Sequence, residues 1–176
     1  PWDNGYPGGA VGTNWATVGS TRIETFVCPS EANNFFRTKN GVNFVYPTNY
    51  GFNFGTWFVY NPATGEGGTG AFHPNSQYKS KEFRDGLSKT LMISEVKAFT
   101  PYVRNTSDPG STYPAGSPPS DDSQIASLAA GGQNKMGPAT NSNTGHTEWP
   151  DGRVHHTGFT ATFTPNTVVE FAVGGV

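Results

Sequence analysis

Apolar and polar residues alternate in several short stretches of the chain, and this alternation is the spacing of a half-buried β-strand. It is clearest where aromatic residues recur at every second position, as Tyr50, Phe52 and Phe54 do. Because side chains along a strand point alternately to its two faces, these three rings share one face. The pattern predicts strands over 21–28, 41–46, 49–60, 71–73, 89–96 and 168–173.

Turn and helix signals separate these strands. The pair Asp121-Asp122 opens a stretch that ends before Gly131-Gly132, which predicts one short helix over 121–130. The turn residues at 150–152 separate two strand-like runs and predict a hairpin within 146–163. Residues 1–19 form an irregular, Gly/Pro/Asn-rich lead-in, and residues 105–120 form a Pro/Ser/Gly loop.

We therefore expect a single domain over residues 1–176, of the α+β class and mostly β, with an antiparallel sheet, long loops and one short helix. A chain of 176 residues suits one domain. Aliphatic residues are scarce, but aromatic residues make up 14% of the chain and can supply a core. The 23 glycines and 14 prolines keep the elements short.

Charge and cysteine content exclude several classes of function. Charged residues are 14% of the chain, and the formal net charge is −2. Nucleic-acid binding by phosphate neutralisation and polybasic membrane-surface binding both need a basic face, so neither is expected. The single cysteine, Cys28, excludes an internal disulfide and a zinc finger. The neutral, polar and aromatic composition favours an extracellular, cell-surface or periplasmic location.

One group of residues resembles half of a metal site. His146, Glu148 and His155 lie close in sequence, and across the expected hairpin the first two could face a histidine of the 155–156 pair. Their spacing matches no known zinc motif. The alternative is that one histidine of the pair is a buried hydrogen-bonding residue and the other is exposed.

We expect no enzymatic activity and no resident cofactor. No serine lies in a Gly-x-Ser-x-Gly elbow, and the Gly-rich stretch 65–70 lacks the Lys-Ser/Thr pair of a phosphate-binding loop. Calcium stays an alternative, because Asp121 and Asp122 offer hard oxygen ligands. A helix N-terminus explains the same acidic pair equally well.

Three aromatic residues are candidates for ligand binding. Trp57, Tyr60 and Tyr102 lie beside expected loops, where flat rings can stack on sugar faces. Most of the other rings are needed for the core. A glycan- or small-solute-binding module displayed at the cell surface is therefore the alternative to a structural role.

Four segments occur in an order that resembles a known family. They are FVCPS at 26–30, NYG at 49–51, FRDGLSKT at 83–90 followed by LMISE, and HTEWPDGRVHHTGFTATFTPNT at 146–167. Together they resemble the large paralogous family of planctomycete pilin-like proteins of unassigned function, over nearly the whole chain. The chain departs from the family pattern at Leu87 and Lys89, where Thr and Asn are usual, and at Ser94, where Gly is common.

The resemblance implies the globular head of a protein similar to type IV pilins or type II secretion pseudopilins, without its N-terminal hydrophobic helix. It implies a non-enzymatic structural subunit at the cell surface. Its partners would be other pilin-like subunits or further copies of itself, joined through the missing helix, which would also supply any membrane contact. Polysaccharide is the alternative partner.

The resemblance also singles out five motif residues for structural roles: Asp85, Gly86, Glu95, Asp151 and Gly152. The Asp-Gly pairs suit turns, because the aspartate can bond the local backbone and glycine tolerates a positive φ. The glutamate at the end of its strand is expected to pair with a nearby Arg or Lys.

Overall fold

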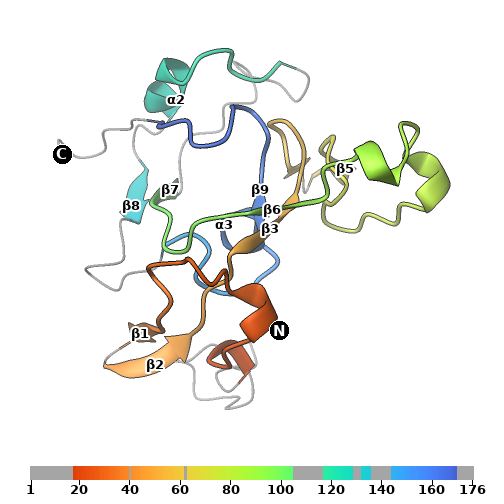
Figure 1. The fold of residues 1–176 in the computed structure, drawn as a ribbon. Helices are drawn as coiled ribbons and strands as arrows, with labels where there is room; N and C mark the ends of the chain where they lie inside the picture. Colours follow the sequence, from red (N-terminus) through yellow and green to blue (C-terminus); the bar gives the residue numbers. More distant parts are fainter. Residues whose placement is uncertain are drawn as a thin grey trace. The chain divides into compact units, whose positions relative to one another are not determined.

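The computed structural model describes residues 18–39, 41–61, 63–104, 117–128, 132–135 and 144–169. Residues 1–17 of the expected lead-in and 105–116 of the expected loop lie outside the described residues. Packing divides the chain into two compact units. Figure 1 traces the chain and labels its helices and strands. Unit 1 comprises Pro1–Gly51, Glu95–Tyr102 and Lys135–Thr157, and unit 2 comprises Phe52–Ser94, Val103–Asn134 and Gly158–Val176.

The elements are short, as the glycine and proline content predicts. With 3₁₀ turns labelled η, they are in chain order η2 (Glu24–Phe26), β1 (Arg37–Lys39), β2 (Val42–Val45), β3 (Tyr50–Asn53), β4 (Tyr60–Asn61), β5 (Glu66–Gly67), η3 (Ser80–Glu82), η4 (Leu87–Lys89), β6 (Ile93–Glu95), β7 (Tyr102–Arg104), α2 (Ser123–Leu128), β8 (Gln133–Lys135), α3 (Val154–Thr157) and β9 (Gly158–Phe159). The predicted class, α+β and mostly β, is confirmed.

Unit 1 contains the antiparallel hairpin β1–β2, and its register shifts between Arg37 and Thr38. Phe44 and Val45, at the end of β2, are both buried, so this strand does not alternate between solvent and core. Aromatic pairs cover the edge of the core: half-buried Phe36 meets buried Tyr46 edge to face, and exposed Phe35 stacks on buried Phe99, each with ring centroids 4.8 Å apart. Such pairs stabilise a core beyond the area that they bury.

Asn49 connects three stretches of unit 1: its own, the one around Cys28 and the one around Val96. Its side-chain oxygen accepts a hydrogen bond from the Cys28 backbone at 3.0 Å, and its amide nitrogen donates to Glu31 Oε2 at 2.7 Å and to the Val96 carbonyl at 3.1 Å. Its backbone also bonds to Phe26 and Val96. Asn49 is 1% exposed, so leaving any of these polar groups unpaired would be costly.

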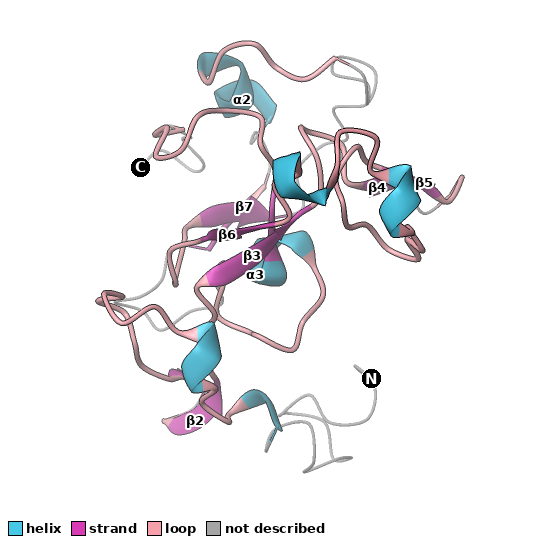
Figure 2. Cartoon of the chain, turned by 45° about the vertical axis from the view of Figure 1, so that its right-hand side comes forward, coloured by secondary structure: helices cyan, strands magenta, loops and turns pink. Residues whose placement is uncertain are grey.

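Unit 2 contains a parallel pairing of β3 with β9, in which Phe52 lies opposite Gly158 and Asn53 opposite Phe159. The sheet order is β6-β3-β9, and Figure 2 shows β6 beside β3. Asn53 N donates to Met92 O at 2.9 Å. This parallel pair is an exception to the antiparallel pairing expected from the sequence. A parallel partner more than a hundred residues away leaves no turn signal in the sequence.

Several sequence-based elements are corrected by the structure. Residues 21–28 contain the turn η2 in place of a strand, and the predicted hairpin over 146–163 contains helix α3. The strand expected over 89–96 shrinks to β6, after η4. The helix expected over 121–130 is present as α2, and Asp121 accepts a hydrogen bond from Ser123 N at 2.8 Å at its start.

In the described part of the chain, no helix has the length and apolar character needed to cross a membrane.

A buried ionic cluster as the candidate functional site

Backbone hydrogen bonds hold the segment 144–157 of unit 1 at its beginning. Gly145 exchanges two backbone hydrogen bonds with Thr100, at 2.8 and 3.2 Å, and a Cβ on Gly145 would lie 3.0 Å from two carbonyl oxygens. His146 N donates to the His155 carbonyl at 2.8 Å, and His146 Nδ1 donates to the His156 carbonyl at 3.1 Å. The segment therefore closes on itself and holds its interior side chains in place.

Asp151 starts helix α3 and so decides which side chains face inward. Its Oδ1 accepts a hydrogen bond from Arg153 N at 3.0 Å, and its carbonyl accepts one from Thr157 Oγ1 at 2.7 Å. A carboxylate that accepts the backbone N–H two residues further on forms an Asx turn, and here this turn leads the chain into α3. The helix buries His156 and leaves His155 half-buried.

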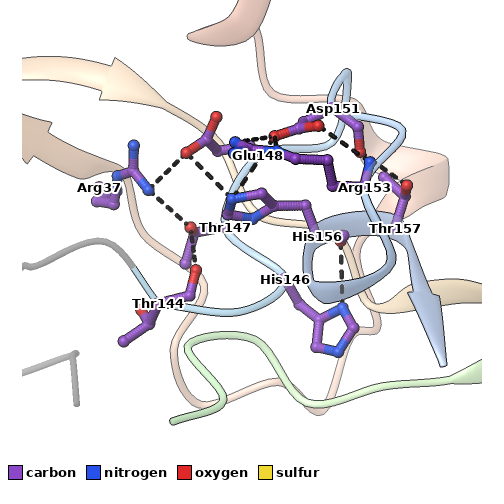
Figure 3. A network of polar contacts seen from close by, with 9 residues as sticks. All are labelled: Arg37, Thr144, His146, Thr147, Glu148, Asp151, Arg153, His156 and Thr157. Atoms are coloured by element: carbon purple, nitrogen blue, oxygen red, sulfur yellow. Dashed lines mark hydrogen bonds and ion pairs between the residues drawn. The ribbon is translucent and has the colours of Figure 1, made fainter. Parts of the chain in front are cut away.

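Five ionisable side chains meet in unit 1, and we call them the ionic cluster: Arg37, Glu148, Asp151, Arg153 and His156 (Figure 3). Arg37 Nη1 lies 2.7 Å from Glu148 Oε1, and Arg153 contacts Asp151 Oδ2 at 2.5 and 2.7 Å. His156 Nε2 lies between the carboxylates, 3.3 Å from Glu148 Oε1 and 3.7 Å from Asp151 Oδ2.

The cluster is closed to solvent except at Arg153. Glu148 and His156 are 0% exposed, and Arg37 is 3% exposed. Thr147 supports Arg37 by accepting a hydrogen bond from its Nη1 at 3.1 Å, and Thr147 Oγ1 in turn donates to the Thr144 carbonyl at 2.7 Å. A buried charge needs a counter-charge, and a guanidinium group lies at ion-pair distance from each of the two carboxylates. Among the described residues, neither oxygen of Glu148 and neither ring nitrogen of His156 has a hydrogen-bond partner, so the cluster is held by charge pairing and burial.

Burial sets the protonation of the cluster. It lowers the pKa of His156 far below its usual range, and the nearby His155, Arg153 and Arg37 lower it further. It also lowers the pKa of His146, and it raises the pKa of Glu148 while the Arg37 guanidinium opposes that shift. With His156 neutral, two guanidinium groups balance two carboxylates, so the cluster carries no net charge.

Glu148, Asp151 and His156 also form a set of metal-ligand types, because one donor atom from each lies within 4.8 Å of the others. Both carboxylates, however, are already held by guanidinium groups. A divalent cation would leave two uncompensated positive charges in a buried site, which is strongly unfavourable. We therefore interpret the cluster as an ion-pair lock that fastens β1 to the segment 144–157.

The metal-ligand candidates from the sequence fall in different places. Glu148 belongs to the ionic cluster, whereas His146 and His155 use the contacts described above at its edge. Asp121 and Asp122 begin α2, and hydrogen bonds to Ser123 lower the pKa of the Asp121 carboxyl.

Arg37 and Arg153 are the members of the cluster that sequence reasoning missed. Arg37 opens a strand far from the C-terminal motif, 110 residues before its partner Thr147, so no local spacing points to it. His156 was expected on a strand, where neighbouring side chains point apart. On a helix the rings of His155 and His156 stay together, with centroids 4.3 Å apart.

The aromatic candidates also separate. Trp57 lines an open pocket of about 340 Å³ within unit 2. Tyr60 is half-buried in β4, opposite Gly67. Tyr102 begins β7, and its ring stacks on that of His155 with centroids 4.7 Å apart. These rings therefore do not share one binding surface within either unit.

The remaining motif residues lie in turns or at a strand end. Asp85 is exposed in a turn, and Gly86 follows it with φ 83°. Glu95 is exposed at the end of β6, and it takes part in no ion pair among the described side chains, which do not include that of Arg104. Gly152 is exposed beside Asp151, with open space around its Cα.

Comparison with known proteins places the whole described chain in one family. No curated protein and no solved structure matches it. A family model with the description "Protein of unknown function (DUF1559)" matches residues 1–169. The chain therefore belongs to this family of planctomycete-type proteins of unknown function.

Proposed function

We propose that this chain is a non-enzymatic, pilin- or pseudopilin-like structural subunit at the cell surface or outside the cell. The observation that carries the proposal is that residues of the segments behind the family resemblance make their contacts inside the fold. Asn49 of NYG joins the segments around Cys28 and Val96. Glu148 and Asp151 of the C-terminal segment neutralise Arg37 and Arg153. Because these residues bind other parts of the same unit, they favour a structural role over ligand binding.

The chemistry of the ionic cluster supports the same reading. A general acid, base or nucleophile must come within hydrogen-bond reach of its substrate. Glu148 and His156 have no exposed surface, and both are held by neighbours from within unit 1. The ionisable groups with the largest pKa shifts therefore serve stability, as buried ion-pair networks often do. Partners of the subunit would be further copies or other pilin-like subunits.

Localisation in the source cell tests the proposal. An epitope tag placed after residue 169 would be followed by immunogold electron microscopy and by protease treatment of intact cells. We expect label outside the cell, on filaments or at a secretion apparatus, and cross-links to like subunits. A cytoplasmic protein tagged in the same way provides the control. Label that stays protected inside intact cells would overturn the proposal.

A further inference from the structure

The open pocket of unit 2 has a lining of mixed chemistry. Apolar and polar side chains both contribute: Trp57, Ile125, Phe163, Thr162, Thr164 and Asn166. Its volume of about 340 Å³ falls within the range of small-molecule sites, roughly 300–1,000 Å³. The lining contains no charged side chain among the described residues. An ionic ligand would therefore find no counter-charge there.

The hydroxyl groups of the pocket are oriented by the protein. Thr167 Oγ1 donates its proton to the Thr164 carbonyl at 2.8 Å, so it accepts at 3.0 Å from Thr164 Oγ1. Thr162 Oγ1 donates to the Thr56 carbonyl, so in its 3.4 Å contact with Thr160 Oγ1 it is the acceptor. A hydroxyl has one proton and two lone pairs. Thr160, Thr162, Thr164 and Thr167 therefore each donate their hydroxyl proton within the protein, and only their lone pairs are left for a ligand.

Lone pairs beside aromatic surface define a ligand class. A ligand rich in O–H donors can bond to the threonine oxygens, whereas a phosphate or carboxylate would meet only lone pairs at these four threonines. The C–H faces of a sugar ring can in addition pack on Trp57 and Phe163. We propose that this pocket binds a neutral saccharide, an activity that goes beyond the structural role and does not depend on it. Because the pocket is open, both ends of a saccharide chain can continue into solvent.

Binding by the purified chain tests the proposal. Residues 1–176 would be screened on an array of neutral and acidic oligosaccharides, and the best neutral ligand would be measured by isothermal titration calorimetry. We expect selective binding of neutral oligosaccharides. Trp57→Ala should weaken it at least roughly tenfold, about 1.4 kcal/mol. Tyr60→Ala is the matched control, because Tyr60 is a half-buried ring three residues away and outside the pocket lining. We expect it to bind as the wild type does.

A second variant separates loss of binding from loss of folding. Thr167→Val keeps the side-chain shape and removes the hydroxyl that orients Thr164. We expect a circular dichroism spectrum like that of the wild type and affinity reduced roughly threefold to tenfold. Three results would each overturn the proposal: no binding of any neutral oligosaccharide, preference for acidic ones, or wild-type affinity in both pocket variants.

Discussion

At the scale of single residues, the ionic cluster turns on Glu148, which neutralises Arg37 and contacts His156. None of these side chains has more than 3% of its surface exposed. Removing one partner of a buried pair leaves the other charge unpaired in a dry environment, which costs far more than the pair contributes. The strength of the lock therefore depends on keeping all its members.

The first prediction concerns Glu148→Gln. Loss of the carboxylate leaves Arg37 buried without its counter-charge, so the free energy of unfolding should fall by about 3–5 kcal/mol. Glu24→Gln is the control, because Glu24 pairs with Arg22 at the surface, where an ion pair contributes about 0–1 kcal/mol. Urea denaturation of both variants measures the difference. Equal stability of the two variants would show that the cluster carries no stabilising charge pair.

The second prediction concerns pH. Burial lowers the pKa of His146 and His156, so below their ordinary value of 6.5 the unfolded chain binds protons that the folded chain does not. Their contribution to stability is present above pH 6.5 and is lost as the pH falls. Each fully released proton changes the free energy of unfolding by about 1.4 kcal/mol per pH unit.

The raised pKa of Glu148 acts in the opposite sense, because the folded chain then holds a proton more tightly than the unfolded chain does. Two histidines outweigh one glutamate, so we expect stability to decrease from pH 7 to pH 5. His156→Gln should flatten this dependence. Denaturation midpoints at a series of pH values are the measurement, and an unchanged slope in the variant would contradict the assignment.

The third prediction concerns metals. Because guanidinium groups already neutralise both carboxylates, addition of Zn²⁺ or of EDTA should leave the melting temperature unchanged. Differential scanning fluorimetry and elemental analysis of the purified chain are sufficient. One equivalent of bound metal, together with a lower melting temperature in EDTA, would show that the cluster is a metal site.

Residue-level prediction from the sequence reached Glu148, Asp151 and the His155–His156 pair, but neither of the two arginines that neutralise the carboxylates. The acidic residues stand in a compact motif, so they could be singled out. Arg37 lies too far away for any spacing rule, and His156 was assigned to the wrong periodicity. The error has a physical origin: Asp151 accepts the Arg153 backbone N–H and so starts a helix where a turn between strands was expected.

At the scale of elements, the turn before η4 shows where sequence reasoning succeeds. The Asp85-Gly86 pair suggested a positive φ, and Gly86 has φ 83° and ψ 149°. By contrast, the strands expected over 41–46 and 49–60 end earlier, at Val45 and Asn53. Gly55, with φ 121°, interrupts the second stretch although its aromatic alternation continues. Periodicity finds an element, but single backbone positions decide where it ends.

The fourth prediction follows from Gly86. Its dihedral angles belong to a region that is almost restricted to glycine, and a Cβ there would meet nothing closer than Ser88 Oγ at 4.0 Å. Gly86→Ala should therefore destabilise the fold through backbone strain alone, by about 1–3 kcal/mol. Gly152→Ala, where a Cβ enters open space without a positive φ, should have little effect. If Gly152→Ala lowered the melting temperature more than Gly86→Ala does, the strain would not lie at Gly86.

At the scale of the whole molecule, the chain has a low net charge of −2 and exposes several apolar side chains. Leu87, Leu91 and Ile93 are about half exposed, in and just before β6. Low net charge gives little repulsion between copies, while short edge strands limit pairing between sheets. We therefore expect copies of the chain to associate weakly and not to form an ordered assembly.

The fifth prediction concerns assembly. The proposed pilin-like role assigns assembly to a long hydrophobic helix, and no helix in the described part of the chain has that length and apolar character. We therefore predict that residues 1–176 alone are monomeric or weakly associated, and that fusion to a hydrophobic helix promotes fibres. Sedimentation velocity and negative-stain electron microscopy measure both forms. Regular filaments from residues 1–176 alone would mean that the globular part itself builds the assembly.

The long separation of Arg37 from the segment 144–157 has a consequence for biosynthesis. Arg37 and Thr147 are 110 residues apart, and a ribosome adds roughly 5–20 residues per second, so the lock closes roughly 5–20 s after its first arginine is made. During that interval the nascent unit 1 holds an arginine that it cannot bury. Unit 1 therefore cannot complete its ion-pair lock until residues 144–157 have been synthesised.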